Sequence, residues 1–117
     1  MLYEITDETF EAQVLQSPVP CVIEFTAGWC DLCDRLLPVL EELSGEFAGE
    51  VKFCTANTDT QRKLRIKFAV AALPYIVMVR DGRRIPLFDS LVTAERLSER
   101  IRYVLDGGEA LSFEQKW

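Results

Sequence analysis

The hydrophobic positions of this chain fall into two patterns that succeed one another along the sequence. Short apolar runs rich in β-branched and aromatic residues predict strands, and they cover residues 2–5, 21–26, 51–55, 73–79 and 85–88. Between them, apolar residues recur at three- and four-residue steps, which predicts amphipathic helices near residues 6–15, 30–47, 61–68 and 93–105. The Asp81-Gly82 dipeptide separates the last two runs and is typical of a two-residue hairpin.

Capping and breaking residues bound the predicted helices. Thr6 or Asp7 can cap the first helix, and Thr93 can cap the last one, which glycines 107 and 108 end. Pro38 lies inside the second helix and removes its bond to the carbonyl of Asp34, so we expect a kink there. The resulting order, βαβαβαββα, predicts an α/β sheet with helices on both faces and an antiparallel edge. We expect one domain over residues 1–108 and a tail over residues 109–117.

Composition and charge restrict the possible functions. The 117 residues carry a net charge of −6, which argues against nucleic acid and anionic membranes as partners. No apolar run is long enough to span a bilayer, and residues 1–8 lack the pattern of a secretory signal, so we expect a cytoplasmic protein. The sequence contains no histidine, which excludes Ser-His and Cys-His triads and histidine-ligated metal sites.

The segment Trp29-Cys30-Asp31-Leu32-Cys33 is the strongest candidate for chemistry, because it lies between a predicted strand and a predicted helix. Unpaired N–H groups and the positive end of the dipole at a helix start stabilise a thiolate, which favours Cys30 as a nucleophile. A Cys-x-x-Cys in a βαβ pattern indicates thiol–disulfide chemistry. The alternative is a zinc site joining these two cysteines to Cys21 and Cys54, which we otherwise expect to be buried and inert.

Four features occur in order along the chain: the run from Val22 to Cys30, Pro38 five residues after Cys33, Leu73-Pro74-Tyr75, and the Asp81-Gly82 turn. Through these features residues 2–106 resemble the thioredoxin family, with Val22 to Cys30 as its central strand and active-site approach. The resemblance implies the thioredoxin fold, a central mixed sheet flanked by helices on both faces.

The chain departs from the family pattern at several positions. Asp31-Leu32 replaces Gly-Pro between the cysteines, Glu24 replaces a buried aspartate, Thr55 replaces a lysine often found near that acid, and Asp89-Ser90-Leu91 replaces a glycine-containing stretch. These departures bear on the redox potential, the reductase and the substrates, and leave the reaction type unchanged.

The resemblance implies roles for the residues around the motif. Cys30 is expected to be exposed and to attack the substrate, and Cys33 to be shielded and to resolve the mixed disulfide. Glu24, on an apolar strand, is expected to be desolvated and to accept the proton of Cys33. The alternative for Glu24 is a carboxylate that merely faces solvent.

Five further residues complete the predicted site. Trp29 is expected to form an exposed shelf beside the thiol, the alternative being a core tryptophan. Pro74, if cis, would present the backbone of Leu73 to a bound substrate, the alternative being a trans-proline that begins a strand. The negative charge of Asp31 next to Cys30 counteracts the stabilisation of the thiolate by the helix dipole. We therefore expect Asp31 to raise the pKa of the Cys30 thiol and to favour reduction over oxidation, unless solvent screens its charge. Leu32, lacking the rigidity of proline, also tunes the pair.

These observations together predict a protein-disulfide reductase acting through a Cys30–Cys33 dithiol, with no cofactor besides this redox-active disulfide and no metal. Its partners would be disulfide-containing proteins and an electron donor of the thioredoxin-reductase type. The alternative is a thioredoxin-like binding or adaptor module with weak turnover. The basic segment 61–67 is either a solvated surface or a docking face for an acidic partner.

Overall fold

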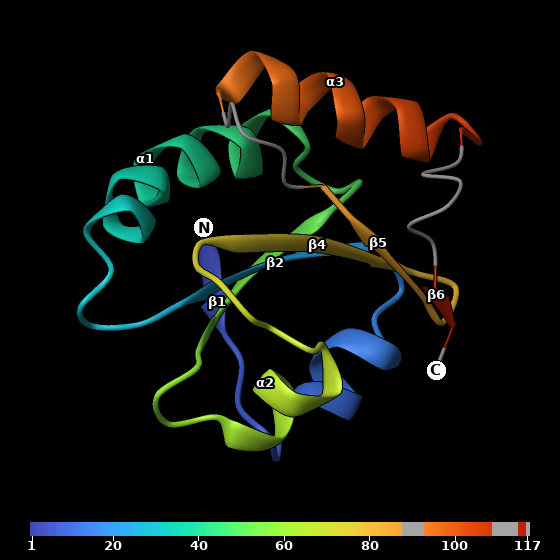
Figure 1. The fold of residues 1–117 in the computed structure, drawn as a ribbon. Helices are drawn as coiled ribbons and strands as arrows, with labels where there is room; N and C mark the ends of the chain where they lie inside the picture. Colours follow the sequence, from blue (N-terminus) through green and yellow to red (C-terminus); the bar gives the residue numbers. More distant parts are fainter. Residues whose placement is uncertain (88–92, 109–114, 117) are drawn as a thin grey trace.

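The computed structural model describes residues 1–87, 93–108 and 115–116. The elements in chain order are β1 (Leu2–Glu4), η1 (Glu11–Leu15), β2 (Cys21–Thr26), α1 (Asp31–Glu46), β3 (Lys52–Asn57), α2 (Arg62–Lys67), β4 (Tyr75–Arg80), β5 (Arg83–Pro86), α3 (Ala94–Leu105) and β6 (Gln115–Lys116). Six strands form one sheet in the order β1-β3-β2-β4-β5-β6. Helices α1 and α3 cover one face of it, and α2 covers the other together with the blue turn η1 (Figure 1).

The sheet is mixed, as the sequence predicts. Strand β3 pairs in parallel with β1 and β2, whereas β4 runs antiparallel to both β2 and β5. The β4–β5 hairpin turns at Asp81 and Gly82, whose φ angles of 53° and 75° are both positive. Positive φ at both central residues matches the right-handed twist of the strands, so the predicted hairpin is confirmed.

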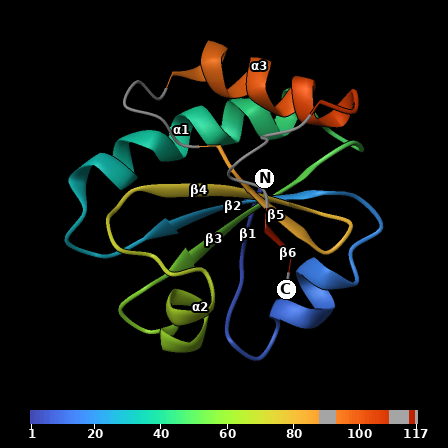
Figure 2. The ribbon, with the colours of Figure 1, turned by 45° about the vertical axis from the view of Figure 1, so that its right-hand side comes forward.

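Strand β2 is buried on both faces because helices cover both sides of the sheet, as the rotated view also shows (Figure 2). Val22 packs into the core beneath α1 and α3, with Leu40 of α1. Ile23 and Phe25 pack into the opposite core, with Leu64 of α2. Since side chains alternate along a strand, Glu24 lies on the same face as Val22, beneath α1.

Helix α1 confirms the predicted amphipathic helix and positions the cysteines. Its buried side chains are Cys33, Leu36, Leu40 and Leu43, which recur at three- and four-residue steps. Pro38 lies within the helix, as predicted. The helix begins directly after Cys30. The apolar residues that pack α1 on the sheet therefore also fix the position of the two cysteines at the N-terminal end of the helix.

The predicted first helix is observed as two consecutive turns. In the first, the N–H of Phe10 donates to the carbonyl of Thr6, and in the second, the wide turn η1, the N–H of Gln16 donates to the carbonyl of Glu11. Thr6 caps the preceding turn, its Oγ1 accepting from the N–H of Thr9 at 3.1 Å. Asp7 instead accepts from the N–H of Leu64 at 3.0 Å, at the start of α2. The carboxylate of Asp7 is thus used by a helix distant in sequence, which local spacing cannot reveal.

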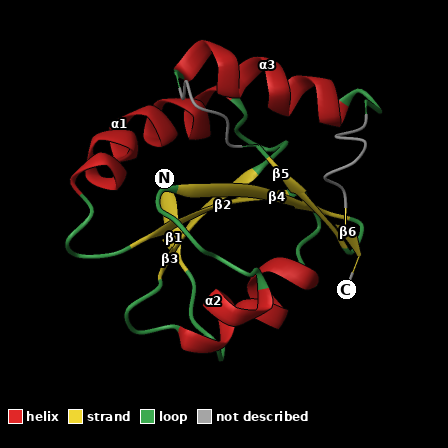
Figure 3. Cartoon of the chain, in the orientation of Figure 1, coloured by secondary structure: helices red, strands yellow, loops and turns green. Residues whose placement is uncertain are grey.

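The remaining elements agree with expectation in type (Figure 3). Thr93 caps α3, its side chain accepting from the N–H of Arg96. Strand β6, paired antiparallel with β5, was not predicted and follows the domain boundary that we placed at residue 108. Residues 88–92, 109–114 and 117, which include the Asp89-Ser90-Leu91 stretch and most of the predicted tail, lie outside the described residues. No helix in the described part of the chain has the length and apolar character needed to cross a bilayer.

Candidate active site

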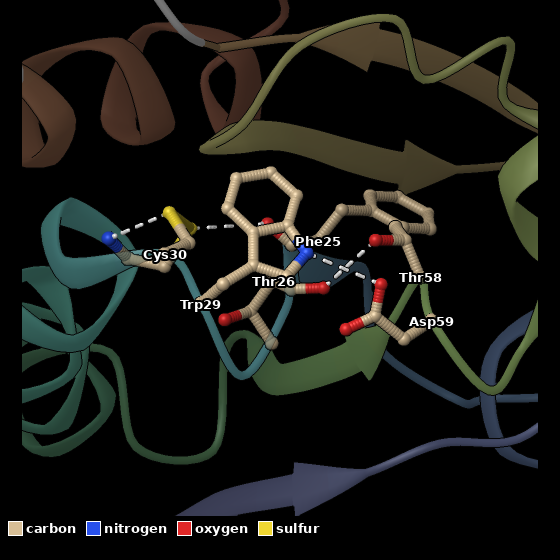
Figure 4. The surroundings of a disulfide bond; sticks show 7 residues. Phe25, Thr26, Trp29, Cys30, Thr58 and Asp59 are labelled. Carbon is tan, nitrogen blue, oxygen red and sulfur yellow. Dashed lines mark hydrogen bonds between the residues drawn. A yellow bond between two sulfur atoms is a disulfide. The ribbon is translucent and has the colours of Figure 1, made fainter.

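The two cysteines of the motif form a disulfide across the first turn of α1. Their Cα atoms lie 5.3 Å apart, within the range that a disulfide requires. Cys30 is the N-cap residue, and its Sγ accepts from the N–H of Cys33 at 3.1 Å (Figure 4). This N–H is one of the donors that a helix start leaves unpaired, so it stabilises negative charge on the Cys30 sulfur.

Both cysteines are covered in the disulfide form. Cys33 is fully buried, as expected, and its Sγ lies 3.9 Å from the carbonyl oxygen of Phe25. Cys30 is only 6% exposed, so the expectation of an exposed Cys30 is wrong for this state. Ala27 and Leu73 pack against the pair and account for the cover. A partner disulfide therefore has to reach Cys30 between these neighbours.

Glu24 is a buried carboxylic acid beneath α1. It is fully buried, and neither carboxylate oxygen has a hydrogen-bond partner among the described residues. Thr55, its neighbour in register on β3, brings no positive charge. Burial, and secondarily the negative charge of Asp34, raises the pKa of Glu24 to about 8. The solvent-facing alternative is therefore wrong, and Glu24 can hold or release a proton near neutral pH.

Trp29 lies open beside the disulfide. Its side chain is 69% exposed, so the alternative of a core tryptophan is wrong. The indole Nε1–H donates to Oδ1 of Asp59 at 3.3 Å (Figure 4). Asp59 is positioned in turn by Asn57, whose Oδ1 accepts from the Asp59 N–H at 2.8 Å. The exposed indole that we expected is thus held by a hydrogen bond to the carboxylate of Asp59.

Asp59 and its neighbour Thr58 are site residues that the sequence reasoning missed. Thr58 donates from its hydroxyl to the carbonyl of Thr26 at 3.0 Å, which ties the segment after β3 to the end of β2 (Figure 4). The available signal was topological: the carboxyl ends of parallel strands meet at one edge of a sheet, and functional groups gather there. Strand β2 leads to Trp29 and strand β3 leads to Asp59, so their meeting follows from parallel pairing.

A pocket of about 420 Å³ is lined by Trp29, the residue before Cys30, and by Leu73, which packs on the disulfide. Asp59 and, from α2, Arg62 and Arg65 also line it. The Leu73–Pro74 peptide is cis, as predicted, and Pro74 is buried. Of the predicted site residues, Trp29, Leu73 and the cysteines are therefore brought together.

Asp31 and Leu32 occupy the first turn of α1, where both are exposed and Leu32 is 52% accessible. The other two cysteines, Cys21 and Cys54, are buried in the core beneath α2, separate from the cluster around Cys30 and Cys33. The four thiols therefore do not converge as the zinc alternative requires. Among the described residues, no three Cys, Asp or Glu side chains form a group that could hold a metal ion.

Comparison with known proteins gives a consistent result. Residues 1–103 match the family model described as Thioredoxin. The chain is 40% identical over 77 residues to Thioredoxin C-2 of Corynebacterium nephridii, covering 66% of this chain and 71% of that protein. It is 37% identical over 79 residues to Thioredoxin of Haemophilus influenzae (68% and 74% covered), and 28% identical over 98 residues to Thioredoxin 1 of Nostoc sp. (84% and 92% covered). The chain belongs to the thioredoxin family, as a thiol–disulfide oxidoreductase that reduces protein disulfides through Cys30 and Cys33.

Proposed function

We propose a division of labour in which Cys30 attacks the substrate, Cys33 resolves the intermediate, and Glu24 takes the proton of Cys33. The observation that carries this proposal is the buried carboxyl group of Glu24, which has no hydrogen-bond partner among the described residues. It lies on β2, beneath the helix that carries the N-cap Cys30 and the buried Cys33. Trp29, Leu73 and Pro74 would receive the substrate chain.

The first step begins from the reduced dithiol. The Cys30 thiolate, stabilised by the N–H of Cys33, attacks one sulfur of the substrate disulfide. A bond forms between Cys30 and that sulfur, the substrate S–S bond breaks, and the other substrate sulfur leaves as a thiolate that takes up a proton. Asp31 is exposed in the first turn, and its negative charge next to Cys30 would disfavour the Cys30 thiolate, which makes Cys30 a poorer leaving group and favours reduction of the substrate.

The second step releases the substrate. Glu24 accepts the proton of the Cys33 thiol, directly or through water, and the Cys33 thiolate attacks Sγ of Cys30. The mixed disulfide breaks, the second substrate sulfur leaves as a thiolate, and the Cys30–Cys33 disulfide holds the two oxidising equivalents. A pKa near 8 suits Glu24 to this task, because the carboxylate is then a strong enough base for a thiol.

The proposal extends to the partners and the compartment. An electron donor of the thioredoxin-reductase type returns two electrons to the disulfide, and no further cofactor is needed. We place the protein in the cytoplasm, because a protein-disulfide reductase recharged by an electron donor works in a reducing compartment. The redox domain takes in residues 1–108, and β6 at residues 115–116 adds an edge strand to its sheet.

The experiment follows resolution of a preformed mixed disulfide between Cys30 and a substrate peptide. Glu24→Gln should slow release of the peptide by about tenfold to a hundredfold, as expected for loss of a general base, and leave the first attack unchanged. Glu42→Gln, an exposed carboxylate on the same helix as the cysteines, is the matched control. Equal release rates in wild type and Glu24→Gln would remove Glu24 from the mechanism. Insulin reduction with dithiothreitol tests turnover itself, because a binding module would not exceed the background rate.

A further inference from the structure

We propose that Arg62 and Arg65 make the pocket beside Trp29 a specificity site for acidic substrates. The preferred substrates would be proteins that carry Asp or Glu on the segment adjoining their reactive cystine. The inference rests on the proposed function, because it names the substrate class of the same redox pair. It adds no covalent step: the arginines would act on substrate binding, and the disulfide exchange is unchanged.

The two arginines belong to the wall of the pocket. They lie three residues apart on α2, a spacing that brings side chains to one face of a helix, and both line the pocket with Trp29, Asp59 and Leu73. Leu73 also packs on the Cys30–Cys33 pair. A substrate segment that leaves Cys30 through this pocket would therefore pass both guanidinium groups.

The guanidinium groups are available to a ligand. Both arginines are exposed, and neither side chain makes a hydrogen bond or an ion pair with any other residue that the structure describes. Arg102, in contrast, forms an ion pair with Glu50 at 2.8 Å on the far helix layer. The nearest acid in the pocket wall, Asp59, already accepts from the indole of Trp29 with one oxygen. Two arginines facing one engaged carboxylate leave an excess of positive charge.

The basic wall is held firmly in place. Leu64 and Phe68 anchor α2 in the core, and Asp7 accepts from the N–H of Leu64 at its start. At its end, Ala69 has a φ of 52°, and the N–H of Val70 donates to the carbonyl of Arg65, which closes the helix. Because the backbone of α2 is fixed, binding a carboxylate to its arginines costs less entropy than binding to a mobile segment.

The pocket and the start of α1 carry opposite charges. The opposite side of the disulfide, in the first two turns of α1, carries Asp31 and Asp34 with only Arg35 to offset them. The protein as a whole has a net charge of −6, so acidic partners are generally repelled. A local basic wall beside the thiol would select, among acidic proteins, those that present carboxylates at this pocket. Arginine suits this task because its planar fork binds a carboxylate through two parallel bonds.

The test uses disulfide-linked dimers of one short cysteine peptide, with either Asp or Asn at the positions flanking the cysteine. The rate constant for oxidation of the reduced, full-length protein is measured from the peptide thiol released after acid quench. We expect wild type to reduce the Asp peptide about fivefold to tenfold faster than the Asn peptide at low salt. Raising the ionic strength to about 0.5 M should remove most of this preference, because exposed charges are screened.

Variants identify the residues responsible. Arg62→Gln/Arg65→Gln should bring the Asp-to-Asn ratio close to one. Lys63→Gln removes one charge from the same helix at an exposed position outside the pocket wall, and should change the ratio less than Arg65→Gln does. A ratio near one in wild type, a ratio unchanged in the double variant, or an equal effect of Lys63→Gln and Arg65→Gln would overturn the proposal. Failure of wild type to reduce either peptide would instead contradict the redox mechanism itself.

Discussion

The protein contains two pairs of neighbouring cysteines that are similarly buried, but only one pair forms a disulfide. Cys30 and Cys33 are 6% and 0% exposed, and Cys21 and Cys54 are 0% and 1% exposed. The first pair forms a disulfide, whereas the second pair remains as free thiols. Burial therefore does not distinguish the reactive pair from the inert one.

Backbone geometry separates the two pairs. Cys30 and Cys33 lie on one helical turn with a Cα separation of 5.3 Å. Cys21 and Cys54 lie on adjacent strands two residues out of register, since Cys54 pairs with Ile23. With strands about 4.8 Å apart and a rise of about 3.3 Å per residue, that offset places their Cα atoms roughly 8 Å apart, beyond the reach of an unstrained disulfide.

The electrostatic surroundings differ as well. The Cys30 sulfur accepts an N–H at a helix start and has an ionisable carboxyl group buried on the strand below. The Cys21 thiol donates to the backbone carbonyls of Gln13 and Val19 at 3.8 and 3.7 Å. The neighbouring Cys21, together with burial, raises the pKa of the Cys54 thiol. Lys52 donates from Nζ to the carbonyl of Gln13 at 2.9 Å. The second pair is thus held in the core beneath α2, with Cys21 bound to backbone carbonyls.

The largest expected effect is on activity. Cys30→Ser should reduce insulin reduction to the background rate of dithiothreitol, because the attacking sulfur is gone. Cys21→Ala/Cys54→Ala should retain activity within about twofold, since neither thiol takes part. Loss of activity in the double variant, with the fold intact by circular dichroism, would contradict the separation of the two pairs.

The next effect is on stability and follows from Glu24. Its pKa is raised from 4.5 to about 8 in the folded protein, so the folded state holds a proton that the unfolded state has lost in this window. The free energy of unfolding should therefore fall by about 3–5 kcal/mol between pH 4.5 and pH 8, relative to Glu24→Gln. Urea unfolding of the oxidised protein across this range measures the difference. Parallel pH curves for wild type and Glu24→Gln would show that the carboxyl is not desolvated.

The sequence predicted the reactive pair well because its determinants are local. The spacing of Leu36, Leu40 and Leu43 fixes one face of α1, and that face fixes where the helix begins relative to Cys30 and Cys33. The burial of Glu24 was expected from its apolar neighbours on β2 only together with the resemblance, because strand alternation alone left a solvent-facing carboxylate open. Elements whose stability comes from such periodic packing were predicted in type and nearly in extent.

Contacts between distant segments were not predictable in the same way. The bond from the Leu64 N–H to Asp7, the bond from Trp29 to Asp59, and the pairing of β6 with β5 depend on which segments meet in space. The low exposure of Cys30 belongs to this class, because Leu73, which packs against it, lies 43 residues later in the chain. Hydrophobic periodicity predicts which face of a helix or strand is buried, and does not predict which segment packs against that face.

The smallest expected effect concerns Asp31. Its carboxylate lies next to Cys30 at the helix start and opposes the dipole, so Asp31→Asn should lower the pKa of the Cys30 thiol in the reduced protein. The effect should shrink at high salt, because Asp31 is exposed. The pH dependence of iodoacetamide labelling at Cys30 measures it. An unchanged or higher thiol pKa in Asp31→Asn would mean that solvent screens this charge.

The most direct test of the account is a redox titration that resolves all four cysteines. The protein is equilibrated in glutathione buffers of graded potential, quenched by alkylation, and the oxidised fraction of each cysteine is read by mass spectrometry. The account predicts that Cys30 and Cys33 oxidise together in one two-electron transition while Cys21 and Cys54 stay reduced. Oxidation of Cys21 and Cys54 to a disulfide in the same range, without loss of the fold, would contradict it.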